Sequence, residues 1–190
     1  MAHHHPGPKA RRTKTPGRPR RTRTPRPAAV NTMQMAATRA ARLSAADVHL
    51  QMAIIRRALA EFSTGQRCLD HWRSLADTAN MAETLAGMGL GSGPEADRAI
   101  HAAQAALHQV HQRHTQRGTW ALRAAELEAL HWLVQLHEVQ LTACSYGELD
   151  AALRRTAHRI AQARSGNASR DAIVVVGDMA TVEAGGACVA

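Results

Sequence analysis

Residues 123–143, RAAELEALHWLVQLHEVQLTA, form the stretch that decides the fold. Leu127, Leu130, Val134 and Leu141 recur at helical spacing and form one apolar face. Further large apolar side chains cover most of the other faces: Trp132, Leu133, Leu136 and Val139. A helix that is apolar nearly all round is buried on most of its sides. The stretch therefore predicts a central helix around which other helices pack.

Capping signals predict where those other helices begin. Ser44 with Asp47, and Ser145 with Glu148, have the spacing of capping boxes, and Pro94 suits a first helical position. The expected helices cover residues 44–65, 68–86, 94–116, 123–143 and 145–164. The sequence thus predicts an all-α bundle of about five helices over residues 44–164.

The whole net charge of the chain, +9, lies in its first 27 residues. This segment holds nine of the 24 basic residues and no acidic one, so the other 15 basic residues balance the 15 acidic ones. The part predicted to fold is therefore formally neutral. Any argument for nucleic acid that rests on total charge concerns the N-terminal segment.

Both ends of the chain are expected to lie outside the bundle. Six of the seven prolines lie in the first 27 residues, and residues 1–43 are predicted to be a disordered basic arm. Met33 and Met35 are candidates for the true start codon, so the arm up to residue 32 could be a start-site artefact. Residues 165–190 are predicted to be a weakly ordered tail, with one short strand at 173–176.

The arm is the first candidate binding element. Its arginines can neutralise phosphates and release counterions, which gives affinity for nucleic acid without sequence preference. Gly17, Arg18 and Pro19 resemble the centre of an AT-hook, although Pro16 stands where an arginine usually precedes the glycine. The arginines expected to make these contacts are Arg11, Arg12, Arg18, Arg20, Arg21, Arg23 and Arg26.

A second candidate is a helix-turn-helix-like unit at residues 139–158. Ala143, Gly147 and Leu153 take its small, turn and apolar positions. Basic side chains on the second helix would then approach phosphates: Arg154, Arg155 and Arg159. Against this interpretation, two acidic residues open the same helix, where they would repel DNA.

A third candidate is a metal or ligand site on the central helix. His131, His137 and Glu138 lie around its apolar arc, where a carboxylate without a partner is costly. Glu128 and His131 have the Glu-x-x-His spacing of di-iron bundles, but the chain supplies no second such pair. A buried polar network or a partly exposed helix edge is therefore favoured over a metal, and no cofactor is predicted.

Two sets of absences narrow the class of protein. No nucleophile elbow or phosphate-binding glycine loop occurs, so the chain is predicted not to be an enzyme. No stretch reaches the ~18 consecutive apolar residues of a membrane span, and the N-terminus lacks the apolar part of a secretory signal. We therefore expect a cytoplasmic protein without a membrane partner.

One turn of the chain resembles a known family. Arg113, His114, Gly118 and Trp120 form an R-H-x-x-x-G-x-W turn between two helices, and the likeness continues through the central helix to Leu141. This pattern is similar to a family of small uncharacterised proteobacterial proteins found in Burkholderia-like genomes, some of them automatically labelled Fis-type regulators. The likeness covers about residues 45–164 and excludes the arm. It implies a helical, cytoplasmic and non-secreted protein and supplies no catalytic or binding residues.

These observations favour a non-catalytic helical interaction or accessory protein with nonspecific nucleic-acid affinity through its arm. One alternative is a transcriptional regulator that uses the unit at 139–158. The other is a small metal- or ligand-binding helical protein. Self-association is also open, because the broadly apolar central helix can be buried in one chain or shared between two.

Overall fold

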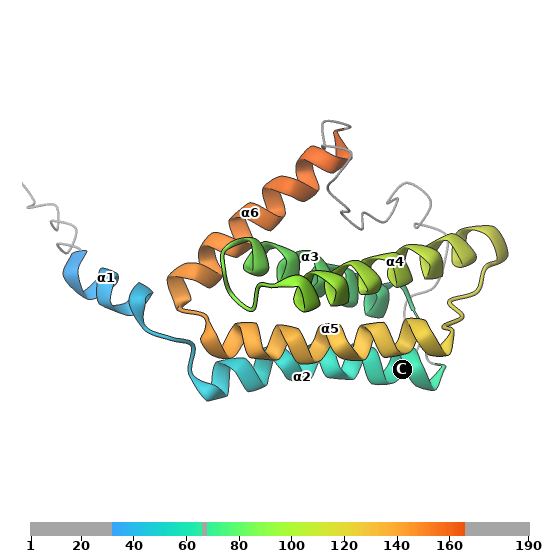
Figure 1. Cartoon of the computed structure of the whole chain (residues 1–190), viewed down its shortest axis with the longest axis horizontal. Coiled ribbons are helices and arrows are strands. Elements are labelled where there is room, and N and C mark those ends of the chain that lie inside the picture. Colours follow the sequence, from blue (N-terminus) through green and yellow to red (C-terminus); the bar gives the residue numbers. More distant parts are fainter. Residues whose placement is uncertain (1–31, 66–67, 166–190) are drawn as a thin grey trace, which may run out of the picture. The chain divides into compact units, whose positions relative to one another are not determined.

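A computed structural model describes residues 32–65 and 68–165, and this part of the chain is all-α (Figure 1). It holds six helices, whose bounds are α1 Thr32–Ala40, α2 Ala45–Thr64, α3 Leu69–Gly87, α4 Pro94–Arg117, α5 Ala124–Ala143 and α6 Tyr146–Arg164. None of them is long and apolar enough to cross a bilayer.

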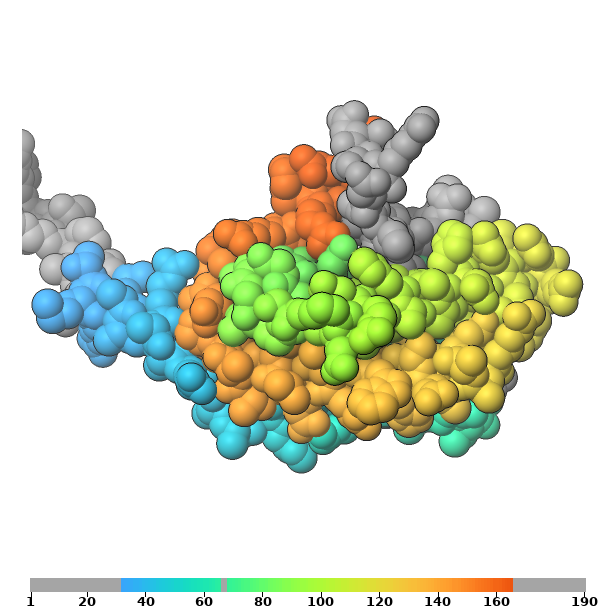
Figure 2. Space-filling view, in the orientation of Figure 1, coloured from blue at the N-terminus to red at the C-terminus, as the bar shows by residue number. Residues whose placement is uncertain are grey.

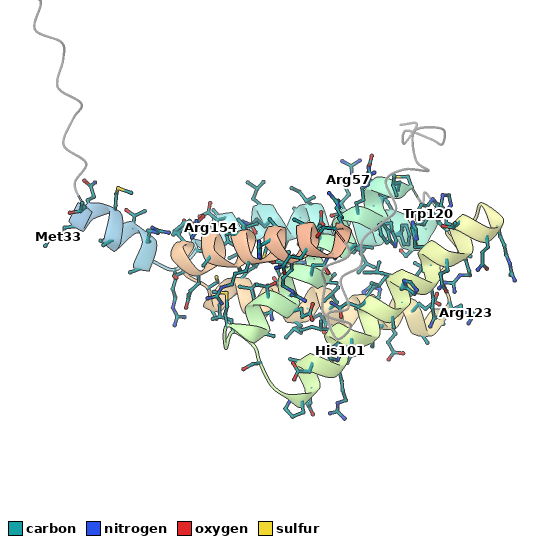
Figure 3. The ribbon with its side chains drawn as sticks, turned by 90° about the horizontal axis from the view of Figure 1, so that it is seen from above. Met33, Arg57, His101, Trp120, Arg123 and Arg154 are labelled. Carbon is teal, nitrogen blue, oxygen red and sulfur yellow. The ribbon has the colours of Figure 1, made fainter. Side chains whose placement is uncertain are left out.

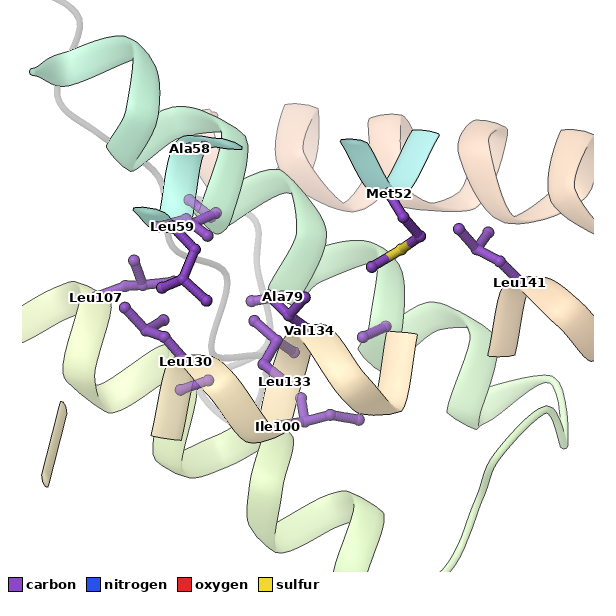
Figure 4. Close-up of a cluster of buried hydrophobic side chains, with 14 of the residues drawn as sticks. Met52, Ala58, Leu59, Ala79, Ile100, Leu107, Leu130, Leu133, Val134 and Leu141 are labelled. Carbon is purple, nitrogen blue, oxygen red and sulfur yellow. The ribbon is translucent and has the colours of Figure 1, made fainter. Parts of the chain in front are cut away.

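Helix α5 is the central helix that its sequence predicts. It packs against α2, α3 and α4, and Leu130, Leu133 and Leu141 are fully buried. Figure 4 shows these side chains meeting those of the surrounding helices. Their neighbours in the core include Met52, Leu59, Ala79, Ile100 and Leu107.

Helix α3 lies between the other helices and depends on small side chains. Ala76, Ala79 and Ala82 are buried there, which lets the neighbouring backbones approach closely. Helix α3 packs on α2, α4 and α5, and it also contacts α6, which in turn packs against α1. Helices α2–α5 thus form the bundle, and α6 and α1 are added to it in turn.

The predicted helix ends are confirmed by their caps. The Ser44 hydroxyl accepts from the Asp47 amide at 3.1 Å, and Ser145 and Glu148 form a reciprocal capping box. Gly118 closes α4 in the left-handed region at φ 67°. The five predicted helices match α2–α6 to within about one or two residues at each end.

The predicted arm boundary at residue 43 is wrong, because the folded part begins earlier and has a sixth helix, α1. The Leu43 amide donates to the Cys144 carbonyl at 3.0 Å, and the Tyr146 amide donates to the Ala41 carbonyl at 3.0 Å. Leu43 itself is buried. These backbone bonds tie the segment before α2 to the turn between α5 and α6, a pairing that local sequence does not encode. The predicted strand at 173–176 lies outside the described residues.

Candidate functional site

The candidate site is a groove where the end of α3, the start of α4 and the middle of α6 meet. Its volume is about 670 Å³. It is lined by Glu83, Thr84, Ala86, Gly87, Ser92, Asp97, Ile100, His101, Arg155, His158 and Arg159. Figure 3 labels His101, which α4 contributes to this groove. Four of the lining side chains can carry positive charge and two carry negative charge.

Glu83 organises one wall of the groove. Its carboxylate accepts from Arg159 at 2.6 Å and from the amide of buried Gln104 at 2.9 Å. Beside it, the hydroxyl of Thr84 receives hydrogen bonds from Thr156 at 2.8 Å and from Arg159 at 3.2 Å. These contacts join α6 to α3 and α3 to α4, so this wall holds the fold together.

Two of the three predicted phosphate-binding residues on α6 form ion pairs with carboxylates. Arg159 is paired with Glu83 and its side chain is only 27% exposed, so its assigned role is structural. Arg154 pairs with Asp150 at 2.6 Å, and the same carboxylate also binds Arg39 of α1 at 2.9 Å. The two arginines beside it hold the pKa of Asp150 below its usual value. Arg159 therefore drops out of the predicted set, and Arg154 is partly neutralised.

Arg155 and His158 are two basic residues of α6 that point into the groove. Both are exposed and line the groove, and neither makes an ion pair or hydrogen bond with any residue of 32–65 or 68–165. They lie three residues apart on one helix and face the same groove as His101 of α4. This arrangement can receive an anionic group such as a phosphate.

The helix-turn-helix-like unit predicted at 139–158 is not packed as such a unit. Leu153, at its apolar position, is 51% exposed, and α6 packs on α3 rather than on α5. Position 147 favours glycine for a different reason: a Cβ there would lie 2.9 Å from the Arg39 carbonyl oxygen. The glycine at the turn position therefore has a structural role in the contact between α1 and α6.

The three residues of the predicted metal or ligand site diverge from one another. His131 is exposed, and Glu138 pairs with Arg56 of α2 at 2.5 Å. His137 is buried, contacts Gln140 at 3.3 Å, and burial lowers its pKa to about 4. Within the described ranges no three histidine, cysteine or acidic side chains are grouped to hold a metal.

The R-H-x-x-x-G-x-W turn has a structural explanation at each position. Arg113 donates to the Ala121 carbonyl at 2.9 Å and to the carboxylate of Glu126, which joins the end of α4 to the start of α5. Gly118 supplies the left-handed cap, and the Trp120 ring folds back onto His114 with centroids 3.8 Å apart and planes 9° apart. The turn is a device for closing the α4–α5 hairpin.

Sequence reasoning missed the groove and the partly buried ion pairs Glu83–Arg159 and Arg113–Glu126. Glu83 and Arg159 are 76 residues apart, so no local pattern connects them. Glu126 gave a usable signal, because an acidic residue in the first turn of an apolar helix is often held by a cap or a cation. The seven arm arginines from Arg11 to Arg26 lie outside the described residues.

The chain was compared with family models, curated proteins and solved structures, and none of them matches. The resemblance of the turn at 113–120 therefore stays a prediction.

Proposed function

We propose that this chain is a non-catalytic helical interaction protein that contacts nucleic acid through charge. The arm would supply most of the affinity, and Arg155 and His158 on α6 would add to it. The observation that carries the proposal is the segregation of charge: nine basic residues and no acidic one lie in the first 27, beside a formally neutral remainder. Charge of this kind favours phosphate contact without base reading.

Two buried groups that could have served catalysis support the non-catalytic part of the proposal. Burial and the nearby Glu148 raise the pKa of the Cys144 thiol to about 11, so the nucleophilic thiolate is scarce at neutral pH. His137, with its pKa lowered to about 4 by burial, is a weak base and has no solvent access.

The two alternatives have less support. The exposed Leu153 removes the packing that a helix-turn-helix needs, and His131, His137 and Glu138 point to different surroundings. We also propose that the protein is bacterial and cytoplasmic. This part of the proposal rests only on composition and on the resemblance of the turn.

The test is a salt series of binding to two duplexes of unrelated sequence, read by fluorescence anisotropy. If six to nine phosphates are contacted, the full chain should bind both duplexes equally, with a log–log salt slope of about −5 to −8. Replacing the seven arginines from Arg11 to Arg26 with glutamine should remove nearly all of this slope. Arg155→Gln should reduce it by about 1.

Arg57→Gln is the matched control, since Arg57 is an exposed arginine of α2 already paired with Glu61. It should leave the salt slope unchanged. If the arm-neutralised chain keeps the full slope, the arm does not carry the binding. If it still selects one duplex over the other, the regulator alternative is favoured instead.

A further inference from the structure

One face of α5 is apolar and faces solvent. Trp132 is 58% exposed and Val139 is 62% exposed, two turns apart on the same side of the helix. Half-buried Leu136 lies between them, and exposed Ala143 continues the line. We call these four residues the α5 face. A tryptophan and a valine this exposed on a helix already buried on its other sides indicate a surface that something covers.

The pattern of this face is that of a helix-pairing seam. Ala125, Ala129, Trp132, Leu136, Val139 and Ala143 follow one another at alternating spacings of four and three residues. Six successive apolar residues at this spacing give the a and d positions of a heptad repeat along the whole of α5. Helix α5 thus has two apolar sides: one fills the core of its own bundle, and the other is exposed at Trp132 and Val139, with Leu136 between them partly packed against the core.

Two charges lie at opposite ends of this surface. The contact between Arg113 and Glu126 at one end, and that between the Leu90 carbonyl and Gln140 at the other, show that α4 and α5 run antiparallel. Arg98 precedes Arg113 by 15 residues, or about 22 Å, so it lies level with the C-terminal end of α5. Glu128 is near the N-terminal end. Figure 2 shows α4 and α5 side by side on the visible face.

Neither charge is strongly neutralised by residues in the described part of its own chain. Arg98 is 76% exposed; within its own helical turn it donates to the Pro94 carbonyl at 3.2 Å and lies 3.9 Å from the carboxylate of Glu95. Glu128 is exposed and has no ion pair with any residue in the described part of the chain. A surface with an acidic group at one end and a basic group at the other is complementary to itself under a two-fold rotation.

We propose that the α5 face is the interface between two copies of this chain. A two-fold axis through its middle brings Glu128 of each copy toward Arg98 of the other, at both ends, and packs the two apolar seams together. Helix α5 is about 30 Å long, and two helices are about 20 Å wide, so the flat area is about 600 Å². This is close to the ~800 Å² that each partner contributes to an ordinary stable interface.

The test is the mass of the full-length chain by sedimentation equilibrium over a concentration series. The wild type should approach twice the chain mass of 20.5 kDa. Trp132→Glu should sediment as a monomer and keep the helical circular dichroism of the wild type. Ile54→Glu is the matched control, because Ile54 is an equally exposed apolar residue, 63%, on α2. It should remain a dimer.

Charge exchange tests the two-fold arrangement separately. Arg98→Glu and Glu128→Arg should each weaken the dimer several-fold, and the double variant should restore it. A monomeric wild type at every concentration overturns the proposal, including the case in which the last residues of the same chain shield Trp132. A dimer that survives Trp132→Glu, or one that dissociates equally in Ile54→Glu, also overturns it, because the contact would then lie elsewhere.

Discussion

Replacing Arg113 with methionine should be among the most destabilising single changes in this chain. The Arg113 side chain is 15% exposed and that of Glu126 is 8% exposed, so the change leaves a buried carboxylate without its cation. Breaking a buried pair from one side costs about 3–5 kcal/mol. Glu126 keeps the hydrogen bond from the Arg123 amide at 2.8 Å, which places the expected loss at the lower end, about 3 kcal/mol.

The measurement is urea unfolding followed by circular dichroism, with the thermal midpoint as a second readout. A loss of about 3 kcal/mol should lower that midpoint by about 10 °C. The double variant R113M/E126M should lose less than the two single variants together, because no unpaired charge then remains. Arg57→Met removes an exposed arginine from a surface pair and should have no measurable effect. The reasoning is refuted if Arg113→Met is as mild as Arg57→Met, or if the double variant shows no coupling.

Three further outcomes follow from single contacts. The native pKa of His137 is about 4 against the usual 6.5, so the unfolded chain binds more protons than the folded chain between these pH values. The free energy of unfolding should therefore rise by about 3 kcal/mol from pH 4 to pH 6.5 and then level off. Urea titrations of His137→Gln should show a flatter rise. Gly147→Ala should detach α1, because the added Cβ would lie 2.9 Å from the Arg39 carbonyl oxygen. The measurement is hydrogen exchange at the Leu43 amide, which should become faster. Gly87→Ala is the control: its Cβ meets nothing within 4 Å, so the exchange rate should not change. Buried Cys144, with its pKa raised to about 11, should resist alkylation at pH 8 until the chain unfolds, which peptide mass spectrometry would show as an unmodified residue.

The sequence predicted the helices well because their ends are chemically marked. Ser44, Pro94, Gly118 and Ser145 each satisfy a local backbone requirement, and all four proved to be helix ends. The same reasoning failed for α1, which has no buried residue and no acidic first turn. That helix is held by its contact with α6, and a contact between elements more than 100 residues apart leaves no local pattern.

The candidate site was much harder to predict than the fold. Basic residues on α6 were recognised, but nothing in the sequence told Arg155, which is open, from Arg159, which is paired with Glu83. Both residues are arginines on the same helix. Their roles differ only because α3 lies next to Arg159. The apolar surplus of α5 was visible in the sequence, yet which of its sides stays exposed depends on where α2 and α4 pack.

The two proposals together predict how the chain engages a long polyanion. Two copies joined through the α5 face carry two arms, and the second arm then binds at the high effective concentration set by its tether. The salt slope of the dimer on a long duplex should therefore approach twice that of a single arm, since each neutralised phosphate adds about 0.9 to it. Trp132→Glu leaves every basic residue in place, so any loss of slope measures the joining of the arms. We expect Trp132→Glu to show about half the wild-type salt slope and Ile54→Glu to show the full wild-type slope. If Trp132→Glu is monomeric but its slope is unchanged, each arm binds alone and dimer formation serves another purpose.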